Sequence, residues 1–335
     1  MEFTIGGRLE VRMTPADVGK RVSVRRVADA PGEGAKFTDT VGVLTSWDDG
    51  VLSITPKSGE SVRIAESSLV AGKVVPAAPA RRRGPSASFE ELTRVAARAW
   101  QPVESEPLGD WRLRAAGGFT RRANSVLPLG DPGLPLGEAL GRVRRWYEER
   151  GLPAYVQTGT GAEGAQERLC AGLEEHGWRR EVSAEMRIGA LAPVGDLEAD
   201  ASAVRLSRST DEAWLSRYQR FDTPGTHVLK VLGSGPSVWF ASVPGDAGAG
   251  GGVPAAIGRC VVDGRWAGFM AVEVGAEYRR RGLATAVMTA LARKALDEGA
   301  SAAWLQVEAD NEGARALYDG MGFATHHRYH HFRSA

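Results

Sequence analysis

The sequence has few cysteines, almost no net charge and no long apolar run. Its two cysteines, Cys170 and Cys260, exclude a disulfide scaffold and suit a reducing compartment. Lysine and arginine total 42 against 41 aspartate and glutamate, so the net charge of +1 argues against binding nucleic acid through bulk charge. No run of about 18 apolar residues occurs, and the first residues lack the basic-then-apolar pattern of a secretion signal. We expect a soluble, cytoplasmic protein with no membrane partner.

The first 76 residues predict a small β-domain in a chain whose length allows two or three domains. Short segments that alternate apolar and polar residues occur at 21–27, 40–47, 51–55 and 61–65. Asp49 and Gly50 form a hairpin signal between two of these segments. Short strands placed this close together are stabilised by curling into a barrel. We therefore predict an SH3-like β-barrel over residues 1–76.

A linker over residues 77–88 is predicted next, because the stretch from Val75 to Ser88 is rich in proline, alanine, arginine and serine. Arg81, Arg82 and Arg83 suggest two interpretations, a phosphate-binding patch or a solvated linker. We favour the linker, because the run is short and the whole chain is nearly neutral.

Two α/β regions follow, at 89–195 and 196–335. Amphipathic helices are predicted near 89–100, with Ser88 as the N-cap, and near 136–151, and strand patterns lie between the helical ones. The second region repeats this order at greater length, which suggests two tandem units of similar layout. A glycine-rich stretch at 245–256 lacks the context of a phosphate loop and is predicted to be a hairpin loop.

The most informative stretch is 266–300, where a strand pattern runs through three arginines and a glycine into a helix. Arg279, Arg280 and Arg281 precede Gly282, and the helix pattern covers about 283–298. Unpaired backbone N–H groups and the positive end of the helix dipole form an anion site at such a junction. Arginines oppose that dipole and need a reason to be there. The alternative is an ordinary strand–helix connection with a basic cap.

A second block follows one strand later. Asn311 begins a short capped helix that contains Ala314, Leu317 and Tyr318 and is followed by Gly322 and Phe323. Together the two blocks resemble the GNAT superfamily of acetyl-CoA-dependent N-acetyltransferases. The Arg-x-x-Gly-x-Ala pattern resembles that superfamily's pyrophosphate loop, and the Asn-x-x-Ala-x-x-Leu-Tyr run resembles its second block.

The resemblance implies an α/β fold: a C-terminal GNAT domain with a mixed central sheet over residues 196–335, preceded by a degenerate GNAT-like half at 89–195. That half lacks the phosphate loop, so we expect it to bind no CoA. The layout also resembles actinobacterial GNAT proteins with an N-terminal SH3-like module, and GGFTRRANSV (117–126) contributes to that likeness. The resemblance implies acetyl-CoA as co-substrate. The implied cofactor-binding residues are Val272, Val274, Arg279, Arg280, Arg281, Gly282, Leu283, Ala284, Thr285, Asn311 and Tyr318.

The resemblance also implies catalytic roles. Tyr318 would protonate the leaving thiolate, and a backbone N–H near Val272 or Val274 would stabilise the oxyanion. The general base would be Glu273 or Glu308, although each has a plain structural alternative, and strand alternation separates Glu273 from Val272 and Val274. Tyr318 has an alternative as a packing residue of an amphipathic helix.

The terminal histidines His326, His327, His330 and His331 would be solvated strand residues, and we expect no metal site. Both cysteines are expected to be buried small hydrophobes.

We predict acetyl transfer to a primary amine of a small molecule or protein. The alternative is a non-catalytic acyl-CoA sensor in which the barrel binds a partner. A protein that binds nucleic acid through the barrel and arginines 81–83 is the third and least favoured hypothesis. The sequence identifies neither the acceptor nor the oligomeric state.

Overall fold

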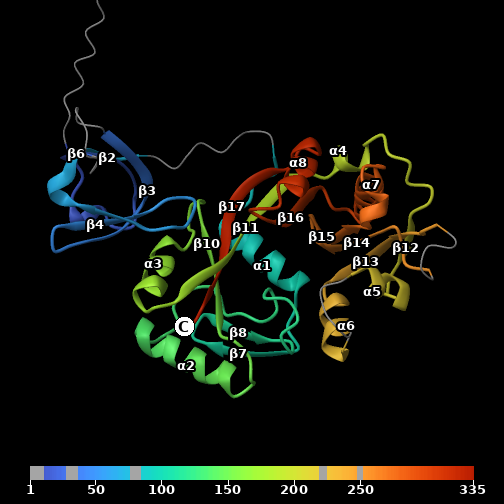
Figure 1. Cartoon of the computed structure of the whole chain (residues 1–335), viewed down its shortest axis with the longest axis horizontal. Coiled ribbons are helices and arrows are strands. Elements are labelled where there is room, and N and C mark those ends of the chain that lie inside the picture. The colour runs from blue at the N-terminus through green and yellow to red at the C-terminus, as the bar shows by residue number, and fades with distance from the viewer. Residues whose placement is uncertain (1–10, 28–36, 76–83, 219–224, 247–251) are drawn as a thin grey trace, which may run out of the picture.

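The computed structural model describes residues 11–27, 37–75, 84–218, 225–246 and 252–335. The predicted arginine patch at 81–83 and the centre of the glycine-rich stretch, 247–251, lie outside these ranges. A small β-domain lies beside a larger α/β body (Figure 1).

The small domain is a six-stranded sheet in the order β1-β6-β2-β3-β4-β5. Its strands are β1 (Val11–Arg12), β2 (Arg21–Val27), β3 (Phe37–Asp48), β4 (Val51–Thr55), β5 (Val62–Ala65) and β6 (Leu69–Val74). All four predicted segments are strands, and the turn at Asp49 and Gly50 has φ values of 48° and 72°, as a tight hairpin requires. Among the described strands β5 does not pair with β1, so the predicted closed barrel is not found there.

The larger body contains an eight-stranded mixed sheet in the order β10-β17-β11-β16-β15-β14-β13-β12. Its strands are β10 (Tyr155–Thr160), β11 (Arg179–Ala190), β12 (Arg205–Ser207), β13 (Ser237–Val243), β14 (Ala256–Asp263), β15 (Trp266–Val274), β16 (Ala302–Glu308) and β17 (Ala324–Arg333). A three-stranded sheet, β7 (Glu104–Leu108), β8 (Trp111–Ala115) and β9 (Leu127–Pro128), adjoins it through a parallel bridge from Val126 to Val156.

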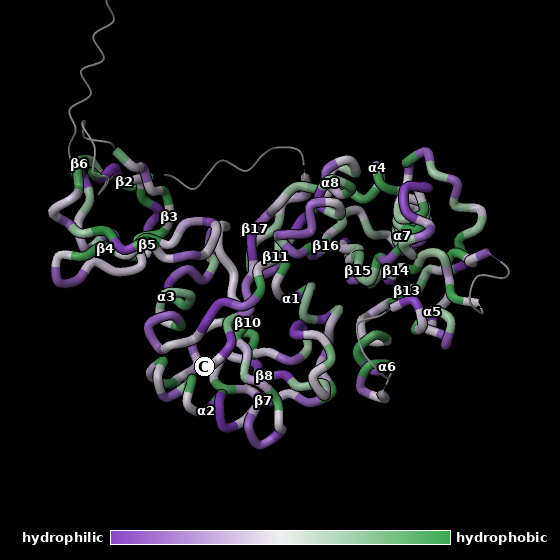
Figure 2. Tube along the Cα trace, viewed as in Figure 1, coloured by the Kyte–Doolittle hydropathy of each residue, from purple (hydrophilic) through white to green (hydrophobic). Residues whose placement is uncertain are grey.

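The helices are α1 (Phe89–Ala99), α2 (Leu136–Glu148), α3 (Glu167–Glu175), α4 (Ala192–Gly195), α5 (Glu212–Arg217), α6 (Thr226–Leu232), α7 (Leu283–Asp297) and α8 (Glu312–Gly320). Ser88 caps α1 as predicted, because its hydroxyl accepts from the Glu91 N–H at 3.0 Å. The tube at α2 carries hydrophilic and hydrophobic residues in turn, as an amphipathic helix should (Figure 2).

The two halves of the body have the same element order and exchange their last strands. The order β9-α2-β10-α3-β11 in the first half matches β15-α7-β16-α8-β17 in the second. However, β11 of the first half pairs antiparallel with both β16 and β17, and β17 pairs with β10. The predicted tandem layout is therefore found, but as one interleaved sheet. The boundary between residues 195 and 196 stays a prediction.

The helices cover the second half of the sheet on two faces. We call one the α7 face, where α4, α7 and α8 pack on residues such as Phe269 and Leu305. We call the other the α6 face, where α1, α5 and α6 pack on residues such as Trp266 and Trp304. Figure 1 shows α4 and α7 above strands β12–β15 and α5 and α6 below them. Because α1 comes from the first half, the α6 face is built by both halves.

The small β-domain contacts the exchanged strands. Arg180 of β11 donates to the Ser58 carbonyl at 2.7 Å, and the Thr160 hydroxyl of β10 donates to the Lys57 carbonyl at 2.9 Å. A Cβ added at Gly59 would lie 2.5 Å from the His330 ring, so this turn requires glycine. The turn at 57–59 therefore packs against β10, β11 and β17 of the large sheet.

None of the described helices is long and apolar enough to cross a membrane. Both cysteines are buried, as predicted, and burial raises the pKa of each thiol to about 12, so both remain protonated.

Candidate active site

The candidate site lies where β15 and β16 separate. The two strands pair in parallel from Trp266 opposite Ala302 to Phe269 opposite Leu305, and no pairing between them continues past that point in the described chain. The opening therefore begins beside Phe269, in the interior of the sheet.

A β-bulge shapes the β15 side of this opening. Ile257 pairs with Glu273 and Arg259 pairs with Met270, so Gly258 alone opposes Ala271 and Val272. Ala271 has a left-handed φ of 52°, which is unusual for a residue with a Cβ. Bulges free backbone groups from the ladder and redirect them. The bulge lies just beyond Phe269, where the pairing of β15 with β16 ends.

The connection from β15 to α7 forms a concave turn of backbone. After a 3₁₀ turn at Ala276–Tyr278, Arg279 is extended, Arg280 has φ 64° and Gly282 has φ 77°. Gly282 is the N-cap of α7 and supplies no side-chain cap, so the first N–H groups of the helix keep their capacity for a ligand. No described atom lies within 4 Å of a Cβ built at Gly282, so open space faces it. The geometry suits an anion.

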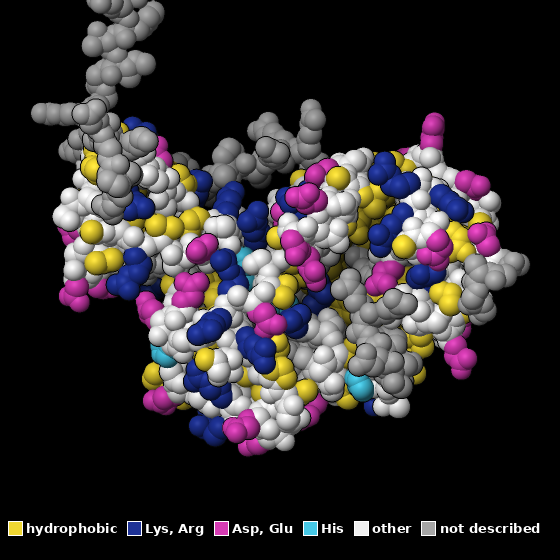
Figure 3. Space-filling view, in the orientation of Figure 1, with side chains coloured by type: hydrophobic (Ala, Val, Ile, Leu, Met, Phe, Trp, Pro, Cys, Tyr) yellow, Lys and Arg dark blue, Asp and Glu magenta, His cyan; other side chains and the backbone are white. Residues whose placement is uncertain are grey.

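The three arginines of this turn are exposed. The Arg281 guanidinium lies 5.4 Å from the Tyr278 ring centroid, and within the described chain none of the three forms an ion pair. Figure 3 shows basic side chains over the α7 region and a recess with hydrophobic atoms between the α7 and α8 regions. The arginines therefore remain available to a bound phosphate.

The remaining predicted cofactor contacts lie on or beside the α7 face of the sheet. Val272, Val274 and Leu283 are partly buried against the apolar cluster of that face, and Ala284 and Thr285 in the first turn of α7 are half-buried. Asn311 caps α8, with its side-chain oxygen accepting from the Ala314 N–H at 3.1 Å. That bond leaves the Asn311 side-chain NH₂ group free to donate.

Tyr318 lies on α8 and points into the same apolar cluster. Its ring contacts Phe323 at 6.0 Å between centroids, and Phe323 contacts Phe269 at 6.5 Å, so one ring separates Tyr318 from the residue where the opening begins. Burial raises the pKa of the Tyr318 phenol to about 12. In the described chain its hydroxyl makes no hydrogen bond, so its proton is held and available.

The two candidate bases lie on the opposite face of the sheet from Tyr318. Glu273 pairs with Ile257, a member of the α6-face cluster, so strand alternation separates it from Val272 and Val274 as predicted. Glu308 lies four residues after Trp304 in β16 and therefore on the same face, and it is exposed at the end of the strand. The opening is thus bordered by a proton donor on one face and two carboxylates on the other.

Sequence reasoning missed a group that the first half brings to this face. The loop 116–126 between β8 and β9 is held by Asn124, whose side chain accepts from the Ala116 and Gly118 N–H groups at 2.7 and 3.0 Å. Arg122 in this loop donates through Nε to Gln306 Oε1 at 2.6 Å and through Nη2 to the Tyr329 hydroxyl at 2.6 Å. The GGFTRRANSV stretch, with its paired glycines and arginines, was the available signal.

The prediction of solvated terminal histidines is wrong for three of the four. His327, His330 and His331 are at most 4 % exposed, because β17 lies between β10 and β11 and helices or the small domain cover it. Burial lowers the pKa of His327 and of His330 to about 3 and that of His331 well below its usual value. His326 is half-buried and contacts the Ala87 carbonyl through Nε2 at 3.0 Å. In the described part of the chain no cluster of His, Cys, Asp or Glu could hold a metal ion.

The first half carries a different kind of cavity at the corresponding place. A cavity of about 640 Å³ is lined by the connection that precedes α2 and by the start of α3, together with α1. That connection contains Pro132 and is capped by Pro135, neither of which has a backbone N–H, and Asp131 adds a negative charge. Arg168 also lines the cavity, but the connection before α2 offers fewer backbone N–H groups to an anion than the turn before α7 does.

Comparisons with known proteins agree with this geometry. Residues 86–332 match the family model described as "Probable histone acetyltransferase Rv0428c C-terminal", and residues 16–73 match "Rv0428c N-terminal Sm-like domain". The second match makes the small β-domain Sm-like and does not support the SH3-like assignment.

Among curated proteins, the chain is 27 % identical over 316 residues to the "Probable histone acetyltransferase Rv0428c" of Mycobacterium tuberculosis, covering 92 % of this chain and 93 % of that one. It is 24 % identical over 253 residues to the "Uncharacterized N-acetyltransferase YobR" of Bacillus subtilis, covering 72 % of this chain and 97 % of that one.

Solved structures show the same fold. A GCN5-related N-acetyltransferase from Kribbella flavida matches with a TM-score of 0.53 at 16 % identity, covering 74 % of this chain and 96 % of that one. A tandem GNAT protein from the clavulanic acid biosynthesis pathway matches with a TM-score of 0.53 at 14 % identity, covering 77 % of this chain and 91 % of that one. The chain belongs to the Rv0428c family of probable acetyltransferases, which makes it an acyltransferase, and it has the fold of the GNAT N-acetyltransferases.

Proposed function

We propose that residues 196–335 transfer an acetyl group from acetyl-CoA to a primary amine, by direct attack within a complex that holds both substrates. The observation that carries this proposal is the opening between β15 and β16, with an anion-binding turn at one end and a bulge in its wall. These features together suit a long thioester whose pyrophosphate is anionic and whose reactive end is neutral.

Binding of acetyl-CoA would use the α7 face. The backbone N–H groups from Arg280 to Ala284 would hold the pyrophosphate, with the side chain of Arg279 beside them. The backbone of Val272 and Val274, free of β16 beyond the opening, would pair with the pantetheine amides. Asn311 would contact the cofactor arm or a bound water.

The two substrates would reach the opening from opposite faces of the sheet. A neutral amine reaching the opening from the α6 face would attack the thioester carbonyl, and Glu273 or Glu308 would take its proton, directly or through water. A backbone N–H of the bulge, near Val272, would stabilise the oxyanion. As the carbon–sulfur bond breaks, Tyr318 would donate its proton to the thiolate. A phenol with a pKa of about 12 is fully protonated at neutral pH, as this role requires.

Titration calorimetry of the full chain with acetyl-CoA, followed by thiol release against a pool of primary amines, tests the proposal. Saturable binding with amine-dependent release supports it. Absence of acetyl-CoA binding refutes the placement of the cofactor site, and binding without release from any amine favours the sensor alternative.

A further inference from the structure

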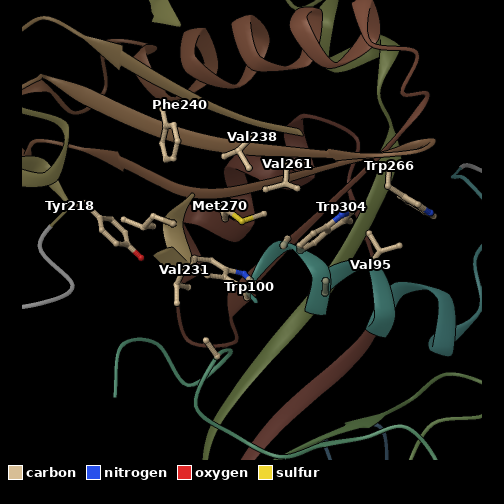
Figure 4. Close-up of a cluster of buried hydrophobic side chains, with 14 of the residues drawn as sticks. Val95, Trp100, Tyr218, Val231, Val238, Phe240, Val261, Trp266, Met270 and Trp304 are labelled. Atoms are coloured by element: carbon tan, nitrogen blue, oxygen red, sulfur yellow. The ribbon is translucent and has the colours of Figure 1, made fainter. Parts of the chain in front are cut away.

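The α6 face of the opening is completed by the first half of the chain. The Arg122 guanidinium lies 5.8 Å from the Trp100 ring centroid and 5.8 Å from the Tyr329 ring centroid. Trp100, at the end of α1, lies close to Met270 of β15, the last residue before the bulge (Figure 4). Gln306, the hydrogen-bond partner of Arg122, is the first residue of β16 beyond the end of its pairing with β15. Arg122 therefore stands beside the opening itself.

The hydrogen bonds of Arg122 leave much of its donor capacity unused. Nε donates to Gln306 and Nη2 donates to the Tyr329 hydroxyl, whereas Nη1 has no partner in the described part of the chain. Nη1 is also absent from the buried unpaired atoms, so it is open to solvent. The edge of the guanidinium formed by Nη1 and Nη2 is the edge that binds a carboxylate with two parallel hydrogen bonds.

The positive charge of Arg122 is not paired with an acidic side chain in the described part of the chain. Its partners are an amide, a phenol and aromatic rings, and within the described ranges it forms no ion pair. By contrast, Arg121, the preceding residue, pairs with Glu181 at 2.7 Å and lies 5.3 Å from the Tyr155 ring. Two neighbouring arginines in one loop thus differ in environment, and Arg122 is the one directed to the opening.

Negative charge lies on the same face. Glu308 acts electrostatically on Tyr329, as Arg122 does, so both groups lie near that phenol. Glu308 nevertheless makes no ion pair with Arg122 within the described chain. A separated cation and anion on one wall match a ligand that carries both charges.

The scaffold fixes Arg122 firmly. Asn124 also donates to the Phe119 carbonyl at 2.6 Å and to the Thr120 carbonyl at 3.0 Å, which closes the loop on itself. Arg259 also lies over the Trp100 ring, at 5.0 Å; it is fully buried and donates to the Ala99 and Leu232 carbonyls at 3.0 and 2.6 Å, joining α1 to α6. A group held this way recognises a ligand with little loss of conformational entropy.

We propose that Arg122 binds a carboxylate of the acceptor, so that the acceptor is a small primary amine that also carries a carboxylate. The inference rests on the proposed acetyl transfer. The acceptor's carboxylate lies on the free edge of Arg122 and its ammonium group lies toward Glu308 and Glu273, where it loses a proton and becomes the nucleophile. The first half of the chain thereby determines acceptor specificity for chemistry carried out in the second half.

The test compares matched acceptors with the full-length chain. Amino acids and ω-amino acids are assayed against their carboxamides and decarboxylated amines by thiol release from acetyl-CoA. We expect kcat/KM for the acid to exceed that of its amide by about 10- to 100-fold, the worth of charge-assisted hydrogen bonds. Arg122→Ala should bring this ratio close to one, and Arg122→Lys, which keeps the charge without the fork, should leave an intermediate ratio. Arg121→Ala is the matched control and should keep the wild-type ratio.

Each outcome either supports or refutes the proposed role of Arg122. An acid-to-amide ratio that falls in Arg122→Ala but not in Arg121→Ala supports the proposal. Equal use of acids and amides by the wild-type chain, turnover of amines but of no acid, or a ratio unchanged in Arg122→Ala overturns it, even where acetyl transfer itself is active. The wild-type comparison stands even if Arg122→Ala does not fold. Failure to bind acetyl-CoA at all refutes the proposed function instead.

Discussion

Gly282 offers the sharpest test of the pyrophosphate site. Its φ of 77° is left-handed, and a Cβ built there meets no described atom within 4 Å. Gly282→Ala would therefore cost backbone strain of about 1–2 kcal/mol without a clash inside the protein. Its methyl group would nevertheless project from the turn where, in the proposed site, phosphate oxygens approach the backbone. We expect acetyl-CoA affinity to fall about 10- to 100-fold, since one charge-assisted hydrogen bond contributes about 1.5–3 kcal/mol.

Gly299 provides a matched control at the other end of α7. It has a left-handed φ of 89°, and its Cβ would also meet no described atom within 4 Å. Gly299→Ala should lower the free energy of unfolding by the same 1–2 kcal/mol, measured by chemical denaturation, and leave acetyl-CoA affinity unchanged in calorimetry. An affinity of Gly282→Ala within a few-fold of wild type would refute the placement of the phosphate site. Equal losses of affinity in both variants would show that strain in α7, and not the site, is responsible.

Two further predictions concern titratable groups. Tyr318→Phe should lower turnover about 10- to 100-fold and leave acetyl-CoA affinity intact, because it removes one proton donor. Since the pKa of Tyr318 is about 12, turnover of the wild-type chain should not decline through ionisation of this phenol below about pH 10. Unchanged turnover in Tyr318→Phe would remove that role. His327, His330 and His331 have a lower pKa folded than unfolded, so the stability that they contribute is nearly complete about one pH unit above their unfolded pKa of about 6.5 and is lost as the pH falls through that value. Between pH 7 and 5.5 the free energy of unfolding should drop by about 3–4 kcal/mol, and a constant value in denaturation at both pH values would contradict the burial of these rings.

Much of the local structure could be predicted from the sequence, because local rules determine it. The Ser88 cap, the hairpin at Asp49 and Gly50, and the amphipathic α2 depend on residues only a few positions apart. The strand–turn–helix around Gly282 is also local, and its left-handed φ is the conformation that glycine adopts at no steric cost.

The pairing of β11 and β17 could not be predicted in this way. Residues near 185 and 328 lie far apart in the sequence, and their alternating patterns are satisfied by several partners in a sheet. The histidine error has the same cause. In a strand with histidines on both faces, polarity suggests solvent, and only the neighbouring strands and helices that cover β17 reverse that conclusion.

The exchange of strands makes the first half part of the large sheet, whatever it binds. Removing it would take β10 and β11 from the large sheet, leave β16 and β17 without their partner between them, and expose buried residues such as Trp304 where α1 now packs. It would also remove Arg122 and Trp100 from the α6 face. The second half therefore could not keep this sheet intact alone, and on the proposal that Arg122 binds the acceptor it would also lose part of the acceptor site.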